Sequence, residues 1–205
     1  MNVPPSTVPF ALPFALPAEL LAQRLEAFHG RAEIAWLGLA GCFEGAGMAV
    51  VRFERLTPGH LGGAGTHALN GGMIACGFDA ACVLAALGHV DTEVVATLTL
   101  QVQYLRRATA SASLVFRAGA TKAAPSVVFV QAALEDPSRG PEPLAVAQAT
   151  LTPVRTRKPL PPAYSRGTDQ GASRHSAAPV IPIGGPPMAA GEASGCGVKV
   201  GQPPP

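Results

Sequence analysis

The spacing of apolar residues changes along the chain from a helical period to a period of two. Apolar residues recur at helical spacing over 18–29, which predicts a first helix. Residues 71–87 are apolar at almost every position, so a second, central helix is expected to be buried on all sides. Residues 93–105 alternate instead, as is typical of a strand, with Thr97 on the polar face and Tyr104 on the apolar face.

Shorter apolar runs complete the predicted set of elements. Two strands are expected before the central helix and three after the alternating strand, over residues 34–39, 47–54, 111–118, 127–135 and 144–154. A loop over 56–69 leads into the central helix, and turns are expected at 119–126 and 136–143. Short connections between successive strands favour an antiparallel meander. This order of elements predicts an α+β fold in which an antiparallel sheet wraps around one central helix.

Composition divides the chain into three segments. Residues 1–17 contain five prolines and are expected to form a Pro-rich N-terminal extension. Residues 155–205 contain ten prolines and eight glycines without a period, so we expect a disordered Pro/Gly-rich tail that buries too little surface to offset its ordering entropy. The segment 18–154 between them has the size of one domain.

Charge and cysteine usage argue against several kinds of partner. The net charge is only +2 and the basic residues are scattered, so no nucleic-acid binding is expected. No apolar run predicts a membrane span, and the N-terminus lacks the basic start of a secretory signal. The four cysteines have neither C-x-x-C spacing nor suitably placed histidines. We therefore expect a cytoplasmic protein with no metal, no cofactor and no disulfide framework.

The central helix carries two features that are suited to chemistry. Asp79 is its only ionisable residue, and a carboxylate among apolar side chains is costly unless it is paired or used. The helix opens on Gly71 and Gly72, and a helix N-terminus presents unpaired N–H groups that can stabilise an oxyanion. Eight residues separate Asp79 from Gly71, about 12 Å along the axis, so the two cannot act on one carbonyl. A two-fold dimer would bring a second copy of the helix and create two equivalent shared sites.

A set of landmarks around this helix carries a family resemblance. The run from His67 through Asn70 enters the helix, and Asp79 follows within it. Later landmarks are the strand end Val-Gln-Tyr-Leu-Arg at 102–106, an Ala118-Gly119 turn and a last strand that starts at Ala145. Over about residues 34–154 the chain thereby resembles the hotdog-fold acyl-CoA thioesterases of the phenylacetate-degradation (PaaI-like) type. The resemblance implies a hotdog fold, a homodimer or homotetramer, and hydrolysis of an acyl-CoA thioester.

The resemblance also implies roles for individual residues. The backbone N–H of Gly71 would hold the thioester carbonyl oxygen, and Asp79 of the partner subunit would act as general base on water or as nucleophile. Asn70 stands where many members have histidine, and its amide could still donate a hydrogen bond to the acyl carbonyl. Val83 stands one turn after the acid, where some thioesterases of this fold have a Ser or Thr that places the water. Another group must therefore place the water in this chain.

Further residues are candidates for contact with the substrate. Arg106, Arg107 and Lys122 flank strand ends and turns, where they could meet the phosphates of coenzyme A or simply be solvated. The remaining candidates are the loop residue His67, the helix-start glycine and two aromatic residues that could shape the acyl pocket: Gly72, Phe78 and Tyr104.

Two other functions remain open. A hotdog hydratase or dehydratase would need a histidine working with a carboxylate, and no histidine lies on the central helix. A non-catalytic acyl-CoA-binding dimer is compatible with the departures at Asn70 and Val83. Asp79 could also be a structural carboxylate, and Gly71 and Gly72 could serve close helix packing. The behaviour of the chain when Asp79 is replaced discriminates between these functions.

Overall fold

The computed structural model describes residues 11–62 and 67–154. Its elements in chain order are α1 (Ala18–His29), α2 (Ala32–Leu37), β1 (Leu39–Glu44), β2 (Met48–Phe53), the 3-10 turn η1 (Pro58–His60), β3 (Leu61–Gly62), β4 (Ala68–Leu69), α3 (Gly71–Leu87), β5 (Val95–Tyr104), β6 (Val115–Ala124), β7 (Val127–Glu135) and β8 (Ala145–Pro153). The expected tail over 155–205 lies outside the described residues. Among the described residues, no helix is long and apolar enough to cross a membrane.

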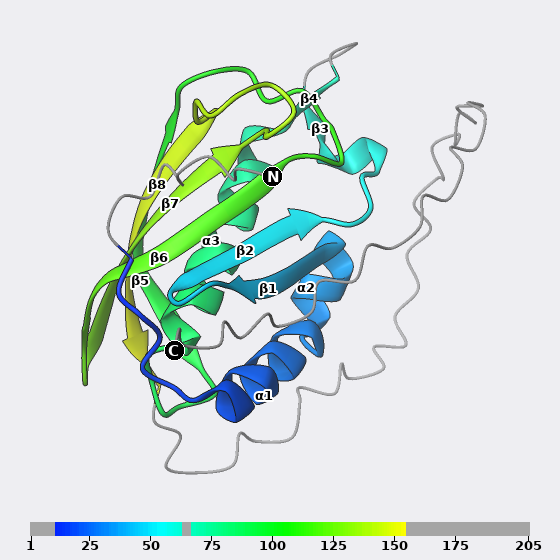
Figure 1. Ribbon diagram of the computed structural model, residues 1–205. Coiled ribbons are helices and arrows are strands. Elements are labelled where there is room, and N and C mark those ends of the chain that lie inside the picture. Colours follow the sequence, from blue (N-terminus) through cyan, green and yellow to red (C-terminus); the bar gives the residue numbers. More distant parts are fainter. Residues whose placement is uncertain (1–10, 63–66, 155–205) are drawn as a thin grey trace, which may run out of the picture. The chain divides into compact units, whose positions relative to one another are not determined.

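One antiparallel sheet wraps around α3, as the sequence predicts (Figure 1). The strand order is β1-β2-β6-β7-β8-β5, and every neighbouring pair is antiparallel. The expectation that the last four strands form a simple meander is wrong, because β6 pairs with β2 and β5 pairs with β8. Pairing β6 with β2 joins the two halves of the sheet into one surface that can cover α3. This order leaves β5 at an edge.

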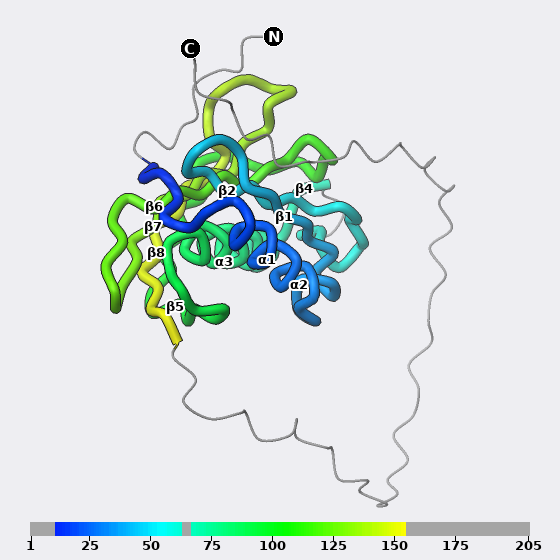
Figure 2. The backbone as a smooth tube through the Cα atoms, turned by 60° about the horizontal axis from the view of Figure 1, so that its bottom comes forward, coloured from blue at the N-terminus to red at the C-terminus, as the bar shows by residue number. Residues whose placement is uncertain are grey.

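The helix α3 is buried through its second half and open at its start. Every residue from Ala80 to Leu87 is buried, whereas Gly71 and Gly72 are exposed and Asp79 is half-buried. The expectation that this helix is buried on all sides is therefore wrong for its first turns, because no described element covers that side. Figure 2 shows α3 with β5 on one side and α1 on the other.

Gly77 lets the sheet approach α3 closely. A Cβ at this position would lie 2.3 Å from Cζ of Phe116, which is fully buried on β6. The Phe116 ring makes edge-on contacts with Phe53 and Phe78, at centroid distances of 5.8 and 5.2 Å. The bare glycine therefore makes room for the central aromatic contact of the core.

Two element boundaries differ from the prediction for identifiable reasons. The apolar run 34–39 is not a strand: α2 occupies Ala32–Leu37 and ends at Gly38, whose φ of 62° stops the helix before β1 begins. A short, mostly apolar run does not distinguish a helix from a strand by its period. The strand expected over 111–118 is β6 (Val115–Ala124), so the expected turn at Ala118 and Gly119 lies inside a strand. The chain reverses at 125–126, at the end of the wider turn expected over 119–126. Gly119 serves a close approach, since a Cβ there would lie 2.6 Å from Cβ of Ala11.

A β-bulge interrupts the alternation of β5. Thr97 pairs with Leu151 and Thr99 pairs with Thr150, so Leu98 has no partner in β8 and is 60% exposed. Because directly paired residues share a face of the sheet, Thr97 lies on the same face as the fully buried Leu151. Tyr104 pairs with Ala145, six residues from Leu151, so the prediction that Thr97 and Tyr104 lie on opposite faces of the strand is wrong.

Residues 11–17 of the expected N-terminal extension pack against the domain. The N–H of Leu12 donates to the carbonyl of Ala120 at 2.7 Å, and the N–H of Phe14 donates to the carbonyl of Ala46 at 2.7 Å. The Phe14 ring contacts Phe43 edge-on at a centroid distance of 4.8 Å. This part of the extension is therefore a strap across one end of the sheet.

Candidate active site

Asp79 is held by a hydroxyl group from the edge strand. Thr97 Oγ1 donates a hydrogen bond to Asp79 Oδ1 at 2.7 Å, and both residues are half-buried. Thr97 reaches the carboxylate because the bulge at Leu98 turns it toward α3. It was not among the candidates from the sequence. The missing hydroxyl at Val83 indicated that another group was needed, but not which one.

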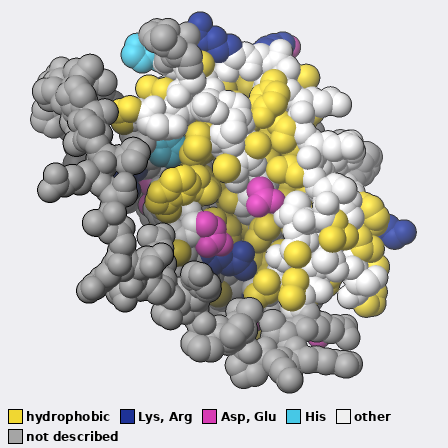
Figure 3. All heavy atoms as spheres, turned by 180° about the vertical axis from the view of Figure 1, so that it is seen from behind, with side chains coloured by type: hydrophobic (Ala, Val, Ile, Leu, Met, Phe, Trp, Pro, Cys, Tyr) yellow, Lys and Arg dark blue, Asp and Glu magenta, His cyan; other side chains and the backbone are white. Residues whose placement is uncertain are grey.

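A hollow of about 580 Å³ opens beside Asp79. It lies between α1, α2, α3 and β5, and most of its wall is apolar: the lining residues are Phe28, Arg31, Glu33, Ile34, Leu37, Ala75, Cys76, Asp79, Ala80, Val83, Val95, Thr97 and Leu100. Seen from behind, the molecule presents acidic groups among apolar side chains (Figure 3). A wall of this composition suits an apolar group whose polar end meets a carboxylate.

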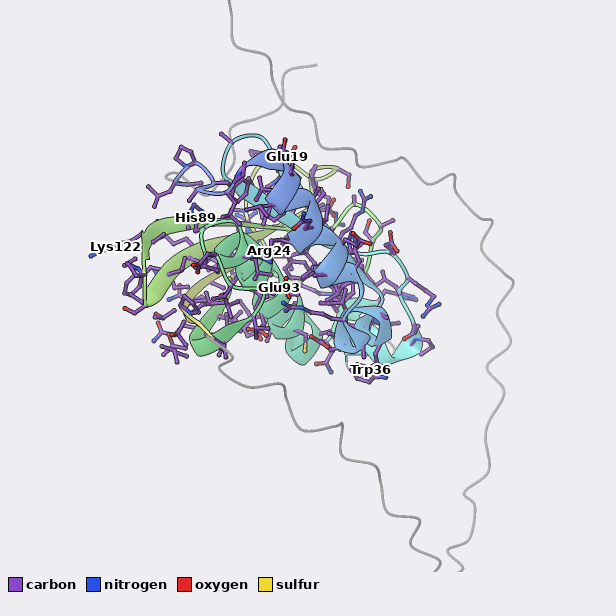
Figure 4. All side chains as sticks on the ribbon, turned by 90° about the horizontal axis from the view of Figure 1, so that it is seen from below. Glu19, Arg24, Trp36, His89, Glu93 and Lys122 are labelled. Carbon is purple, nitrogen blue, oxygen red and sulfur yellow. The ribbon has the colours of Figure 1, made fainter. Side chains whose placement is uncertain are left out.

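Arginines fasten the N-terminal helices to the loop that precedes β5. Arg24 is 6% exposed, donates to the carbonyl of Asp91 at 2.9 Å and forms an ion pair with Glu93 at 3.5 Å (Figure 4). Arg31, which lines the hollow, donates to the carbonyl of Glu93 at 3.1 Å. These bonds fix one wall of the hollow, formed by α1 and α2, to the loop that leads into the strand carrying Thr97.

The thiol of Cys82 behaves as a core group rather than as a nucleophile. Burial raises the pKa of this thiol, and the charge of nearby Asp79 raises it further. The group therefore remains protonated at neutral pH, and a protonated thiol is a poor nucleophile. Among residues 11–62 and 67–154, no three ligating side chains lie together in a way that could hold a metal ion.

The start of α3 is organised by Asn70. Its Oδ1 accepts a hydrogen bond from the N–H of Gly72 at 2.7 Å, and its own N–H donates to the carbonyl of His60 at 2.8 Å. Asn70 is therefore the N-cap of α3, and the side-chain NH₂ remains able to donate. The N–H of Gly71, at the first helical position, has no acceptor within the helix. Tyr104 completes the arrangement by donating to the carbonyl of Gly71 at 2.8 Å.

Two other residues that the sequence offered as candidates lie away from the hollow beside Asp79. Phe78 is fully buried against Phe116 and does not line the hollow, because it faces the sheet. Lys122 lines a different hollow, of about 540 Å³, together with Gln101 and Phe129 on the opposite face of the sheet. Figure 4 shows Lys122 far from α2 and its labelled Trp36.

Three candidates lie at the surface near the end of β5 or in the loop before α3. Arg106 forms an ion pair with Glu142, and Arg107 is exposed. His67 is exposed, and its carbonyl accepts a hydrogen bond from Ala110 at 2.6 Å. None of these side chains lines the hollow beside Asp79 within one protomer.

Solved structures of similar fold include proteins named as thioesterases. The chain is similar to a thioesterase family protein from Silicibacter pomeroyi, with 24% identity, 64% of this chain and 96% of that chain covered, and a TM-score of 0.51. It is also similar to the E. coli PaaI protein from the phenylacetic acid degradation operon, with 16% identity, 67% of this chain and 96% of that chain covered, and a TM-score of 0.57. For zebra fish thioesterase superfamily member 2, the identity is 15%, 68% of this chain and 100% of that chain are covered, and the TM-score is 0.54. These structures show that the chain has the hotdog fold.

The family model of the thioesterase superfamily matches residues 67–141, from the loop before α3 into the β7–β8 connection. The resemblance of the sequence to hotdog-fold thioesterases is thereby confirmed at the level of the family. No curated protein matches the chain.

Proposed function

We propose that the protein hydrolyses an acyl-CoA thioester to the free acid and coenzyme A, in a site shared between two subunits. One observation carries the proposal: the carboxylate of Asp79 is held by Thr97 at the wall of an apolar hollow. A carboxylate fixed in this way can accept a proton from water, while the hollow receives the acyl group. The same helix begins with an exposed N–H at Gly71 that can stabilise an oxyanion.

The edge strand β5 supports assembly as a dimer. Within the described residues, β5 is paired on one side only, through β8. Four of the seven large apolar side chains exposed in the described ranges lie on or beside it: Val94, Leu98, Tyr104 and Leu105. A long exposed apolar edge invites pairing with another strand. Two-fold pairing of β5 strands would set two α3 helices side by side, so that Gly71 of one subunit could meet Asp79 of the other.

The reaction would proceed with these groups in defined roles. The N–H of Gly71, assisted by the amide of Asn70, would polarise the thioester carbonyl. Asp79 would take a proton from water as the water oxygen attacks the carbonyl carbon. When the tetrahedral intermediate collapses, the C–S bond breaks and the thiolate of coenzyme A takes up the proton. In the alternative route, Asp79 attacks the carbonyl directly, and the C–S bond breaks to release the thiolate of coenzyme A. Water then hydrolyses the resulting anhydride to the free acid and the Asp79 carboxylate, and the proton from water is taken up by the thiolate.

The remaining polar candidates would serve the nucleotide portion. Arg106 and Arg107 follow Tyr104 at the end of β5 and would lie near the mouth of a shared site, where guanidinium groups can bind phosphates. His67 would approach from the loop before α3. Lys122 would have to contact coenzyme A from another subunit, since it lies on the opposite face of the sheet.

The direct test is thiol release from acetyl-, hexanoyl-, palmitoyl- and phenylacetyl-CoA. We expect turnover of at least one substrate, and a loss of kcat of about 100-fold or more in Asp79→Asn. Asp91→Asn is the matched control, because its side chain makes no contact with the hollow. Binding of these substrates by calorimetry without any turnover in the wild type would instead identify a non-catalytic acyl-CoA-binding protein. An active monomer in gel filtration would contradict the shared site.

A further inference from the structure

The peptide between Gly71 and Gly72 is held at both of its polar atoms. The N–H of Gly72 donates to Asn70 Oδ1 at 2.7 Å, and the carbonyl of Gly71 accepts from the Tyr104 hydroxyl at 2.8 Å. The acceptor Asn70 is the N-cap of the same helix. The donor Tyr104 lies on β5, 33 residues further along the chain than Gly71. The start of α3 is thus tied to the edge strand by a single phenol group.

This part of the helix needs an external support. Gly71 and Gly72 are both exposed, and two consecutive glycines at a helix end resist fraying less than other residues do. An oxyanion-binding N–H is effective only when it is already aimed at the position where charge develops. Freedom of rotation at Gly71 would therefore weaken its proposed role directly.

The Tyr104 hydroxyl cannot donate a hydrogen bond to the backbone and to the substrate at the same time. A phenol has one proton to donate, and in this structure that proton is donated to the carbonyl of Gly71. The ring covers the same glycine: a Cβ on Gly71 would lie 3.5 Å from Cζ and from the hydroxyl oxygen of Tyr104. The ring and the hydroxyl together favour support of the backbone over contact with the substrate.

We propose that Tyr104 is a positioning residue, which holds the Gly71–Gly72 peptide and thereby aims the N–H of Gly71 at the thioester carbonyl. This inference rests on the proposed hydrolysis. It assigns to β5 a second hydroxyl that orders the site, since Thr97 of the same strand holds Asp79. Each end of the proposed reaction, proton acceptance and oxyanion binding, is thus supported from the edge strand.

Tyr104→Phe removes the hydroxyl and keeps the ring. The first measurement is amide hydrogen exchange of Gly72 by NMR, which does not depend on catalysis. Loss of one neutral hydrogen bond is expected to speed this exchange about threefold to tenfold. Exchange at an unchanged rate would overturn the claim that Tyr104 holds this peptide.

The second measurement is steady-state thiol release with the best substrate of the acyl-CoA panel. We expect kcat of Tyr104→Phe to fall about threefold to tenfold with KM unchanged, because the support matters most when charge develops on the oxygen. Thr99→Val, which removes a hydroxyl from the opposite face of the same strand, is the matched control and should behave as wild type.

The outcomes separate this inference from the proposed function. Faster exchange with an unchanged kcat would show that the contact is merely structural, and would refute the positioning role. A wild type that turns over none of the substrates would refute the proposed hydrolysis, and the exchange rates would still decide whether Tyr104 holds the helix start.

Discussion

Replacing Thr97 by Val tests whether the carboxylate of Asp79 must be held in place. Valine keeps the branched shape and the strand preference of threonine but removes the hydroxyl that donates to Asp79 Oδ1 at 2.7 Å. The variant therefore deletes one hydrogen bond with little change in packing.

The size of the effect follows from the nature of this bond. A hydrogen bond to a charged group contributes about 1.5–3 kcal/mol, and the lower end applies here because both residues are half-buried and water can partly replace the hydroxyl. If the bond orders the carboxylate for proton transfer, its loss should lower kcat about tenfold. The free energy of unfolding should fall by only about 1 kcal/mol.

The assay is thiol release from the best acyl-CoA substrate, with unfolding by urea measured in parallel. Two variants serve as controls. Thr97→Ser keeps the hydroxyl and should retain most of kcat, and Thr99→Val makes the same change two residues along, on the opposite face of the sheet. A Thr97→Val enzyme with the kcat of Thr99→Val would refute the reasoning that the hydroxyl orders Asp79.

Three further predictions concern the core, the pH dependence and the assembly. Gly77→Ala would place a methyl group 2.3–2.8 Å from three atoms of the buried Phe116 ring. Urea denaturation should therefore show that the free energy of unfolding falls by about 1–3 kcal/mol, despite the better helix propensity of alanine. Unchanged stability would show that the ring can move. For the Asp136 carboxyl, burial acts to raise the pKa, but hydrogen bonds from Ser138 and Ser113 outweigh it and hold the pKa below 3.8. The carboxylate therefore stabilises the fold above that value and loses its contribution as the pH falls through the folded pKa. The difference in free energy of unfolding between wild type and Asp136→Asn should be full at pH 7 and shrink below about pH 4. A difference independent of pH would contradict this. Leu98→Lys should set like charges against each other across paired β5 strands, giving a monomer with little activity in gel filtration and thiol release, and an active dimer would exclude this edge as the interface.

The elements that the sequence predicted well are those with a strong local signal. The apolar run of α3 and the pattern over 127–135 were long enough to fix the type and nearly the bounds of both elements. The run 34–39 was too short, and Gly38 rather than any apolar position decides where its helix ends. The sequence alone does not show that Gly119 lies against Ala11, because the two residues are distant in the chain.

In the candidate site, too, only the residues with a strong local signal could be predicted from the sequence. Asp79 and Gly71 could be predicted because one helix carries both, and their spacing follows from helix geometry. Thr97 and the wall formed by α2 could not be predicted. Their positions depend on how β5 pairs with β8 and on arginine contacts between segments more than 60 residues apart.

The unpaired Leu98 makes the site sensitive to chain length as well as to residue identity. Thr97 and Tyr104 are seven residues apart, an odd number, so on a regular strand their side chains would point to opposite faces. They share a face only because one extra residue shifts the count between them. A deletion of Leu98 would restore the regular alternation and force one of the two hydroxyls away from α3, although every functional side chain would still be present. Single-residue insertions and deletions in this strand should therefore be tolerated far less well than substitutions at the same positions.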